Sequence, residues 1–355
     1  MSPVVTPQPW LHRFAVLTAV ATLGLIGMGG LVTSHGAGMA VPDWPTTYGY
    51  NMFLFPVSLW KGGIFYEHSH RLWASLVGLL TTILAVWLWI KEPRRWLRWL
   101  GTGAWFAVVL QGVLGGLRVT LYKDQIGIFH ATLAQLFFIG ICAIALFTSA
   151  WWIKAGSWRE AVVPEQVRRL ILASTLLVLL QLVLGATMRH QHAGLAVPDF
   201  PLAYGKLWPA TDAASLDAIN HQRLDSRDFK AITATQIQLH MAHRVGAVLT
   251  SAMVLLTAWQ IRRLRGLPVA ARRLGGWWAG LILAQFTLGV VTVLSNKAAD
   301  IATAHVLCGA LSLLTGSLLA IISLAARTAP VSATSRETAA SHALFADTKI
   351  TAARQ

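Results

Sequence analysis

The chain has 355 residues, of which 55% are hydrophobic and only 12% are charged. A water-soluble domain could not cover its surface with so few charged side chains, so the composition excludes that class and indicates an integral membrane protein surrounded by lipid. The formal net charge of +15 would also suit a nucleic-acid-binding protein. The positive side chains are confined to short loops between apolar segments, however, which argues against nucleic acid as their partner.

Apolar runs of membrane-spanning length, roughly 20 residues each, predict about eight transmembrane helices. They lie near Phe14–Val32, Leu72–Ile90, Leu100–Leu121, Ile126–Ile153, Leu170–Thr187, Met241–Ile261, Leu274–Leu294 and Ile301–Leu324. Lys and Arg crowd every second connection, at 91–98, 154–169 and 262–273. The positive-inside rule assigns these connections and both termini to the cytoplasm, which predicts a multi-pass protein of the cell (inner) membrane.

The first apolar run resembles a signal peptide, because the small residues of 34–38 would suit a cleavage site. The run is too long for a signal peptide, and the segment after it is repeated later in the chain, so we interpret it as a retained first helix. Cys142 and Cys308 both fall inside predicted helices. No disulfide is therefore expected in an outer loop.

The chain contains an internal repeat. Residues 38–49 and 194–205 are identical at eight of twelve positions, at an offset of 156. Further matches follow in the same order at offsets of 173 to 175: His70 with His243, Gln111 with Gln285, Gly115 with Gly289, and His130 with His305. The repeat predicts an all-α membrane protein built from two homologous, parallel four-helix bundles.

The predicted divisions are an N-terminal half at 1–160, a C-terminal half at 161–327 and a disordered cytoplasmic tail at 328–355. The second half carries an insertion near 206–238, where we expect a short interfacial helix.

The Pro-Asp-aromatic-Pro loops that follow the first and fifth helices cannot be helical throughout, because proline disfavours helix at its own and the preceding position. They form either structured connectors over the bundle end or lids over an outward-facing site, and both roles are compatible.

Four histidines, His70, His130, His243 and His305, sit roughly one turn inside the outer ends of predicted helices. Helices two and four of each half could aim both imidazoles at one iron, which is the geometry of a b-type haem held in a bundle. The alternative is a set of hydrogen-bonded core residues. Structural zinc is disfavoured because no cysteine or carboxylate cluster completes a tetrahedral set.

Residues around these histidines have competing interpretations. Glu67 either favours the helix dipole or handles protons beside a haem, and its counterpart His240 makes the two halves chemically different. Arg71 and Arg244 either pair with haem propionates or anchor helix ends in the headgroups, and Arg118 is a weaker propionate candidate.

Gln111-Gly-x-x-Gly-Gly and Gln285-x-x-x-Gly289 form small-residue helix stripes, which favour close helix packing or a fit against a flat macrocycle. The remaining histidines of the outer region are expected to be solvated or interfacial: His35, His68, His190 and His192.

With these residues in view, the sequence resembles the haem A synthase family, from the first helix to the eighth. The resemblance rests on Glu67-x-x-His70-Arg71, Gln111-Gly-x-x-Gly-Gly, His130, His243-Arg244 and His305, together with the two halves. Some family members carry cysteine pairs in the outer loops, and this chain has none there.

The resemblance implies an oxidoreductase that converts the C8 methyl of haem O to a formyl group by successive hydroxylations with water-derived oxygen. It implies a haem b cofactor on His243 and His305 with Arg244. The substrate haem would bind His70 and His130 with Arg71, and Glu67 would be the catalytic carboxylate.

Two rival functions stay open: a di-haem b-type cytochrome that only relays electrons, and a haem carrier or transporter. The family role also suggests contacts with the haem O-forming farnesyltransferase (haem O synthase), with cytochrome oxidase assembly proteins or with a second copy of the chain, none of which the sequence decides.

Overall fold

The structure is a computed structural model and describes residues 6–154, 161–222, 231–264 and 267–329. Within these ranges, eight helices are long and apolar enough to cross a membrane, which confirms the predicted all-α membrane fold. They are α1 (Pro9–Ser34), α2 (Gly62–Lys91), α3 (Arg95–Thr120), α4 (Asp124–Thr148), α7 (Glu165–His190), α9 (Ala234–Arg263), α10 (Val269–Leu294) and α11 (Ala299–Ala325).

The predicted fourth run was too long. Helix α4 ends at Thr148, and the extended residue Ser149 separates it from the short α5 (Ala150–Lys154). The Ser149 hydroxyl donates a hydrogen bond to the Leu146 carbonyl at 2.6 Å. A side chain that competes in this way for a backbone carbonyl favours a helix end over helix continuation, and hydropathy does not detect it.

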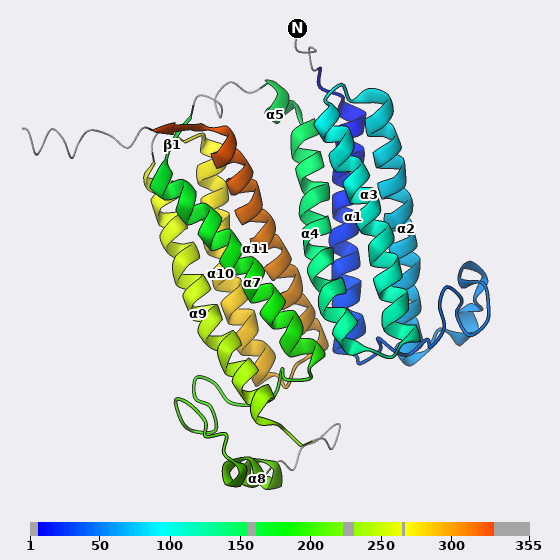
Figure 1. The fold of residues 1–355 in the computed structure, drawn as a ribbon, viewed down its shortest axis with the longest axis vertical. Helices are drawn as coiled ribbons and strands as arrows, with labels where there is room; N and C mark the ends of the chain where they lie inside the picture. The colour runs from blue at the N-terminus through cyan, green and yellow to red at the C-terminus, as the bar shows by residue number, and fades with distance from the viewer. Residues whose placement is uncertain (1–5, 155–160, 223–230, 265–266, 330–355) are drawn as a thin grey trace, which may run out of the picture.

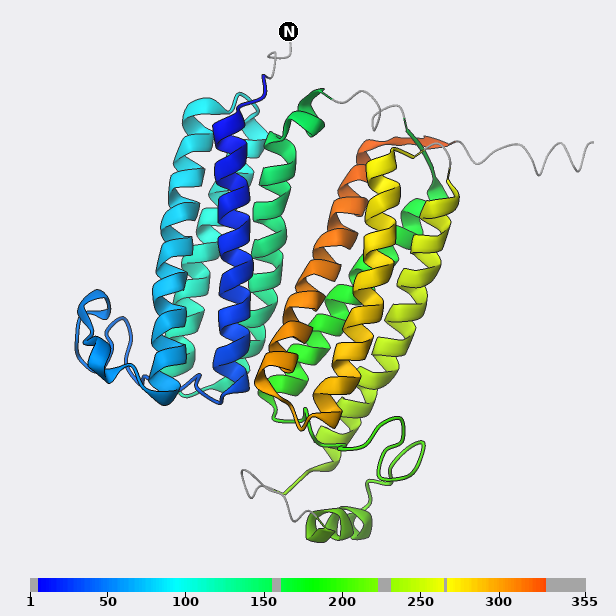
Figure 2. The ribbon, with the colours of Figure 1, turned by 180° about the vertical axis from the view of Figure 1, so that it is seen from behind.

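The long helices form two four-helix bundles (Figures 1 and 2). In the first bundle each helix packs on its neighbours in the order α1–α2–α3–α4, and α4 closes onto α1. The second bundle repeats this order with α7–α9–α10–α11. The bundles meet where α1 and α4 pack against α11 and α7. Helices two and four of each bundle are therefore diagonal partners.

Short elements join or extend the bundles. The turns η1 (Met52–Leu54) and η2 (Val57–Leu59) follow α1, and α8 (Ala213–Gln222) lies inside the predicted insertion. Strand β1 (Val162–Pro164) pairs in parallel with β2 (Arg327–Ala329). The first two residues expected in a disordered tail thus belong to a strand, while residues 330–355 lie outside the described residues.

The two Pro-Asp-aromatic-Pro loops have the same structure. The Asp43 carboxylate accepts hydrogen bonds from the amides of Tyr48 and Gly49, at 2.7 and 2.9 Å. Asp199 accepts the equivalent bonds from Tyr204 and Gly205, at 2.8 and 3.0 Å. Gly49 and Gly205 have φ of 77° and 73°, a conformation that favours glycine.

The carboxylates of these loops are held in their charged form. Burial opposes the charge of Asp43, but hydrogen bonds from Gly49, Thr46 and Tyr48 outweigh it and lower the pKa of this carboxyl below its ordinary value. At Asp199 burial is likewise outweighed by hydrogen bonds from Gly205 and Tyr204, which lower its pKa.

An arginine of the following helix clamps each loop from within. The Arg71 guanidinium donates to the carbonyls of Asp43, Thr46 and Val41 at 2.6, 2.9 and 2.8 Å.

Arg244 repeats the clamp on Asp199, Leu202 and Val197, at 2.6, 3.0 and 3.1 Å. The three acceptors lie at the offset of 156 from those of Arg71. The loops are thus built connectors, held by one charged side chain each.

We predict that Arg244→Gln loosens the second loop without unfolding its bundle. A charged donor contributes about 1.5–3 kcal/mol per hydrogen bond, and the substitution removes three that converge on one loop. We expect the amides of Tyr204 and Gly205 to exchange with solvent at least about tenfold faster, measured by hydrogen exchange and mass spectrometry.

The control is Arg263→Gln, at the C-terminal end of the same helix, where the guanidinium lies 3.8 Å from the Trp259 ring centre. The control should leave these amides unchanged. Unchanged exchange in Arg244→Gln would show that Asp199 holds the loop alone.

Candidate functional site

Each of the four predicted histidines lies against a glycine of the preceding helix. The ring atom Cε1 lies 3.1–3.4 Å from the position that a glycine Cβ would occupy, in the pairs His70–Gly29, His130–Gly115, His243–Gly185 and His305–Gly289. Any side chain at these glycines would press on the imidazole. The glycines therefore let neighbouring helices approach closely and restrict the direction of each ring.

Only two of these four glycines were expected from the sequence. Gly115 and Gly289 were recognised as part of helix stripes, but Gly29 and Gly185 were missed. These two are related by the same offset of 156 as the loops, and that was the available signal.

Glutamine side chains contact three of the four histidines. Gln111 donates to the His130 carbonyl at 3.1 Å. The Gln181 amide lies 2.8 Å from the His243 carbonyl and 3.1 Å from its Nδ1. Gln285 lies 3.2 Å from the Nε2 atom of His305. Gln181 was not anticipated from the sequence.

All four histidines line one cavity of about 1560 Å³, which extends through both bundles. This volume exceeds the roughly 300–1,000 Å³ of ordinary small-molecule pockets. The Nδ1 atoms of His70, His130 and His305 are buried without a hydrogen-bond partner. Buried polar atoms without partners are rare in folded proteins.

The histidines fall into two pairs, one in each bundle. His70 and His130 come from the diagonal helices α2 and α4, and His243 and His305 from the diagonal helices α9 and α11. Within the described ranges, no three His, Cys, Asp or Glu side chains converge as a metal-binding group. Pairs approaching from diagonal helices fit a planar macrocycle with two axial ligands.

Glu67 lies at the wall of the same cavity and is only 4% exposed. One carboxylate oxygen accepts from the Val41 amide at 2.9 Å, and the other accepts from Arg71 at 2.9 Å. Its counterpart His240 is 2% exposed, and its Nδ1 lies 3.1 Å from the Ala193 carbonyl. Both side chains tie a helix to its outer loop, but only the first is an acid.

The arginines of the predicted site have partners that the sequence did not suggest. Arg71 and Arg244 line the cavity, yet their guanidinium groups are occupied by the loop carbonyls described above. Arg118 also lines the cavity and donates to Asp124 at 3.1 Å.

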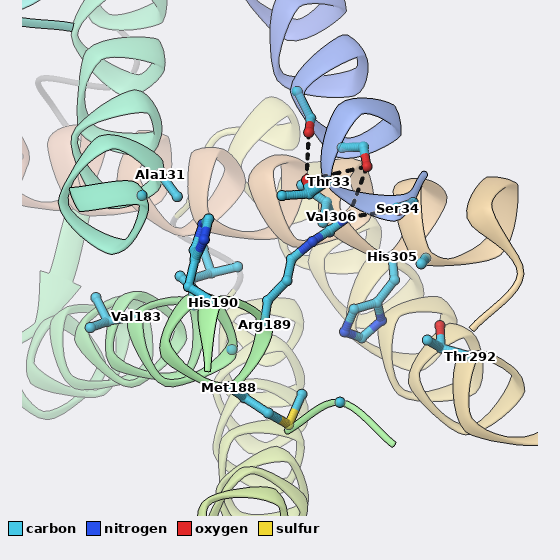
Figure 3. A pocket seen from close by; sticks show the side chains of 18 of the residues that line it. Thr33, Ser34, Ala131, Val183, Met188, Arg189, His190, Thr292, His305 and Val306 are labelled. Carbon is cyan, nitrogen blue, oxygen red and sulfur yellow. Dashed lines mark hydrogen bonds between the residues drawn. The ribbon is translucent and has the colours of Figure 1, made fainter. Parts of the chain in front are cut away.

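The junction of the two bundles adds two residues from the end of α7 (Figure 3). Arg189 donates to the Gly30 carbonyl at 2.8 Å and to the Ser34 hydroxyl at 2.6 Å, both on α1. The His190 ring lies against Gly127 of α4, where a Cβ would clash with it. This pair thus contacts both helices that face it, and His190 belongs to the junction of the bundles.

The expectation that His68 is solvated was wrong. His68 is fully buried, with Nδ1 3.1 Å from the Thr47 hydroxyl. Its ring packs against Phe55 and Trp60, with centroids 4.9 and 4.8 Å away. The aromatic segment after the first loop folds back over the start of α2, a long-range contact that helix periodicity does not encode. His35 and His192 are exposed, as predicted.

Comparisons with known proteins agree with this geometry. A family model described as cytochrome oxidase assembly protein (COX15-CtaA) matches residues 12–317. The chain is 27% identical to a heme A synthase of Geobacillus kaustophilus over 343 residues, covering 92% of this chain and 95% of the relative. It is 27% identical to a heme A synthase of Shewanella oneidensis, covering 86% and 93%. A heme A synthase of a Methylobacterium species is 26% identical, covering 81% and 85%.

The family match begins within α1, ends within α11 and includes every residue of the two histidine pairs. The chain therefore belongs to the COX15-CtaA family of cytochrome oxidase assembly proteins, and the resemblance to haem A synthases found in its sequence is confirmed.

Proposed function

We propose that this protein is a haem A synthase, an oxidoreductase that converts the C8 methyl of haem O to a formyl group with oxygen derived from water. The observation that carries the proposal is the presence of two histidine pairs on one cavity, of which only the N-terminal pair has a carboxylate at its wall. The names of the relatives support the same activity.

In this proposal His243 and His305 hold a haem b cofactor. Both rings line the cavity and lie on glycines of the neighbouring helix, which supports the fit. Haem b supplies a one-electron carrier that can take electrons from the substrate site. Gln181 and Gln285 orient the two imidazoles, and Arg244 keeps the outer loop closed over them.

His70 and His130 bind the substrate haem in the N-terminal bundle. Both rings line the cavity and lie on glycines of the neighbouring helix, which supports a bound macrocycle here as well. Arg71 holds the first loop over this site, so it acts on substrate binding through the loop.

Glu67 is the residue that handles protons. Its two hydrogen bonds, from Val41 and Arg71, fix the orientation of the carboxylate at the cavity wall. An ionised carboxylate has about four acceptor positions, so lone pairs remain for a water molecule in the cavity. Glu67 can thus orient that water and take its proton as the methyl carbon is oxidised.

The orientation in the membrane follows from charge. The N-terminus, the Lys- and Arg-rich connections after α2 and α9, and the end of β2 lie at one end of the bundles, and the Pro-Asp loops at the other (Figure 1). We infer that the first end is cytoplasmic and that the protein lies in the cell membrane. Haem O synthase and other assembly proteins are the partners that this activity would need.

A relay cytochrome is the second candidate, because the two histidine pairs are built alike. Mass analysis of the haems extracted after co-expression with a haem O source separates the two functions. Haem A or its hydroxylated precursor beside haem b is the expected result. Two equivalents of haem b alone would establish the relay.

Substitution of a histidine should remove the bound haem from its own bundle only. We expect His243→Ala or His305→Ala to remove tightly bound haem b, and His70→Ala or His130→Ala to leave haem b in place while abolishing haem O binding. Absorption spectra and mass analysis of the purified proteins measure both contents. Loss of haem b in His70→Ala would reverse the assignment of the two bundles.

Glu67→Gln should stop the reaction with both haems retained. Glutamine preserves the shape and an acceptor for the Val41 amide but cannot take a proton, so we expect conversion of haem O to fall by about 10²- to 10⁴-fold. The matched control is Glu92→Gln, a second 4% exposed carboxylate on the C-cap of the same helix, which pairs with Arg94. It should convert haem O normally. Wild-type conversion by Glu67→Gln would remove Glu67 from the mechanism.

A further inference from the structure

The second and third helices of each bundle, α2 and α3 or α9 and α10, pack side by side, and we call the line along which they meet the seam. At its cytoplasmic end the same contact closes the seam in both halves. A Cβ on Gly101 of α3 would lie 2.6 Å from the Leu88 side chain of α2. The equivalent position Gly275 of α10 meets Ile261 of α9 at 2.9 Å. Two helices therefore pack tightly at this level in each bundle.

The outer part of the seam differs between the halves. In the N-terminal bundle Gly78 lies two helical turns from Ala85, a residue that contacts Gly101, and Gly112 lies three turns from Gly101. Helix periodicity places Gly78 and Gly112 on the facing sides of α2 and α3. Both line the cavity, and no atom lies within 4 Å of where their Cβ atoms would be.

The equivalent positions of the C-terminal bundle carry side chains. At the repeat offsets of 173 and 174, Gly78 corresponds to Ser251 and Gly112 to Phe286. The Phe286 ring packs edge-on against Phe200 of the outer loop, with centroids 6.4 Å apart. Arg244, which clamps that loop, lies over Phe200 at 5.7 Å. Ring, loop and arginine therefore pack together here, and Phe286 places a ring on the cavity wall where the N-terminal bundle has a bare glycine.

In the N-terminal bundle the loop aromatic has no such partner. Trp44, the counterpart of Phe200, lies directly on the backbone of Gly116, where a Cβ would come within 2.5 Å of its ring. One turn further in, at Gly112, the surface of α3 is bare and exposed. The gap thus begins below the loop and leads to the cavity.

The flanks of this gap face outward. Leu76 and Leu79 of α2 are 45% and 57% exposed, and Val109 and Val113 of α3 are 45% and 40% exposed. Such apolar surfaces on membrane helices contact lipid. Behind the gap lie His70, Gln111 and His130, which line the cavity. The gap therefore connects the bilayer with the cavity at the first histidine pair.

We propose that the α2–α3 seam is the lateral opening through which the substrate haem passes between the bilayer and the N-terminal site, and that Phe286 closes the equivalent seam so that the C-terminal site retains its haem. The proposal rests on the proposed function, because it requires one exchanging and one resident macrocycle. A flat, largely apolar tetrapyrrole dissolved in the bilayer can use a gap between two helices without crossing the polar outer loops.

The test introduces the phenylalanine of the C-terminal bundle at the equivalent position of the N-terminal bundle. Gly112→Phe places a ring at the seam, where the space beside Gly112 admits it and the C-terminal bundle already tolerates it. The matched control is Gly103→Phe on the same helix, which also meets open space but does not line the cavity. Purified proteins in phosphatidylcholine nanodiscs are mixed with vesicles that contain haem O, and uptake is followed by absorbance and mass analysis of the extracted haems.

We expect Gly112→Phe to slow haem O uptake at least about tenfold, with haem b content unchanged, and Gly103→Phe to match the wild type. Uptake at the wild-type rate by Gly112→Phe would overturn the opening. Because uptake is measured as total haem bound to the protein, whether or not it has been converted, that result would leave the synthase function intact. Slow uptake together with unreacted haem O in the wild type would support the opening and reject the synthase.

The converse variant, Phe286→Gly, tests whether Phe286 keeps haem b in the C-terminal bundle. Phe286→Gly should accelerate the exchange of resident haem b for added iron-57-labelled haem b at least about tenfold, measured by mass analysis. Exchange as slow as in the wild type would overturn the closing role of Phe286.

Discussion

The contact between an imidazole and the bare backbone of a neighbouring helix determines how this protein is built. A histidine within an apolar bundle is costly unless its ring is enclosed and its nitrogens have a use. Glycine at 29, 115, 185 and 289 lets the helices approach so closely that each ring has little freedom to turn. Since the same contact occurs on diagonal helices of both bundles, it produces two pairs on one cavity.

Duplication supplied two identical frameworks, and a few substitutions made them different. The clamped loops have matching acceptors, matching aspartate hydrogen bonds and matching glycine conformations. Against this background the changes from Glu67 to His240 and from Gly112 to Phe286 stand out. The first removes an acid from the second site, and the second fills a seam that the first bundle leaves open.

The two bundles are joined by contacts between equivalent segments. Arg189 and His190 lie at the repeat offset from Thr33 and Ser34, so equivalent segments of α7 and α1 meet there. Arg189 donates hydrogen bonds to neutral groups of the other bundle, whereas Arg118 donates to the carboxylate of Asp124. The junction therefore joins α7 of the second bundle to α1 of the first, and it places the Arg189 side chain on the wall of the shared cavity.

Hydropathy, an ordered repeat and polar residues in apolar runs are local signals, and they were enough to predict the eight helices, the two parallel halves, the family and the four histidines. What those residues contact depends on packing between segments that are distant in the chain. The loops that Arg71 and Arg244 clamp are 25 to 47 residues away in sequence. The burial of His68, the role of Gly29 and Gly185 and the junction at Arg189 likewise depend on which helices become neighbours. Helix periodicity specifies the face of a residue, but the partner of that face is chosen by packing.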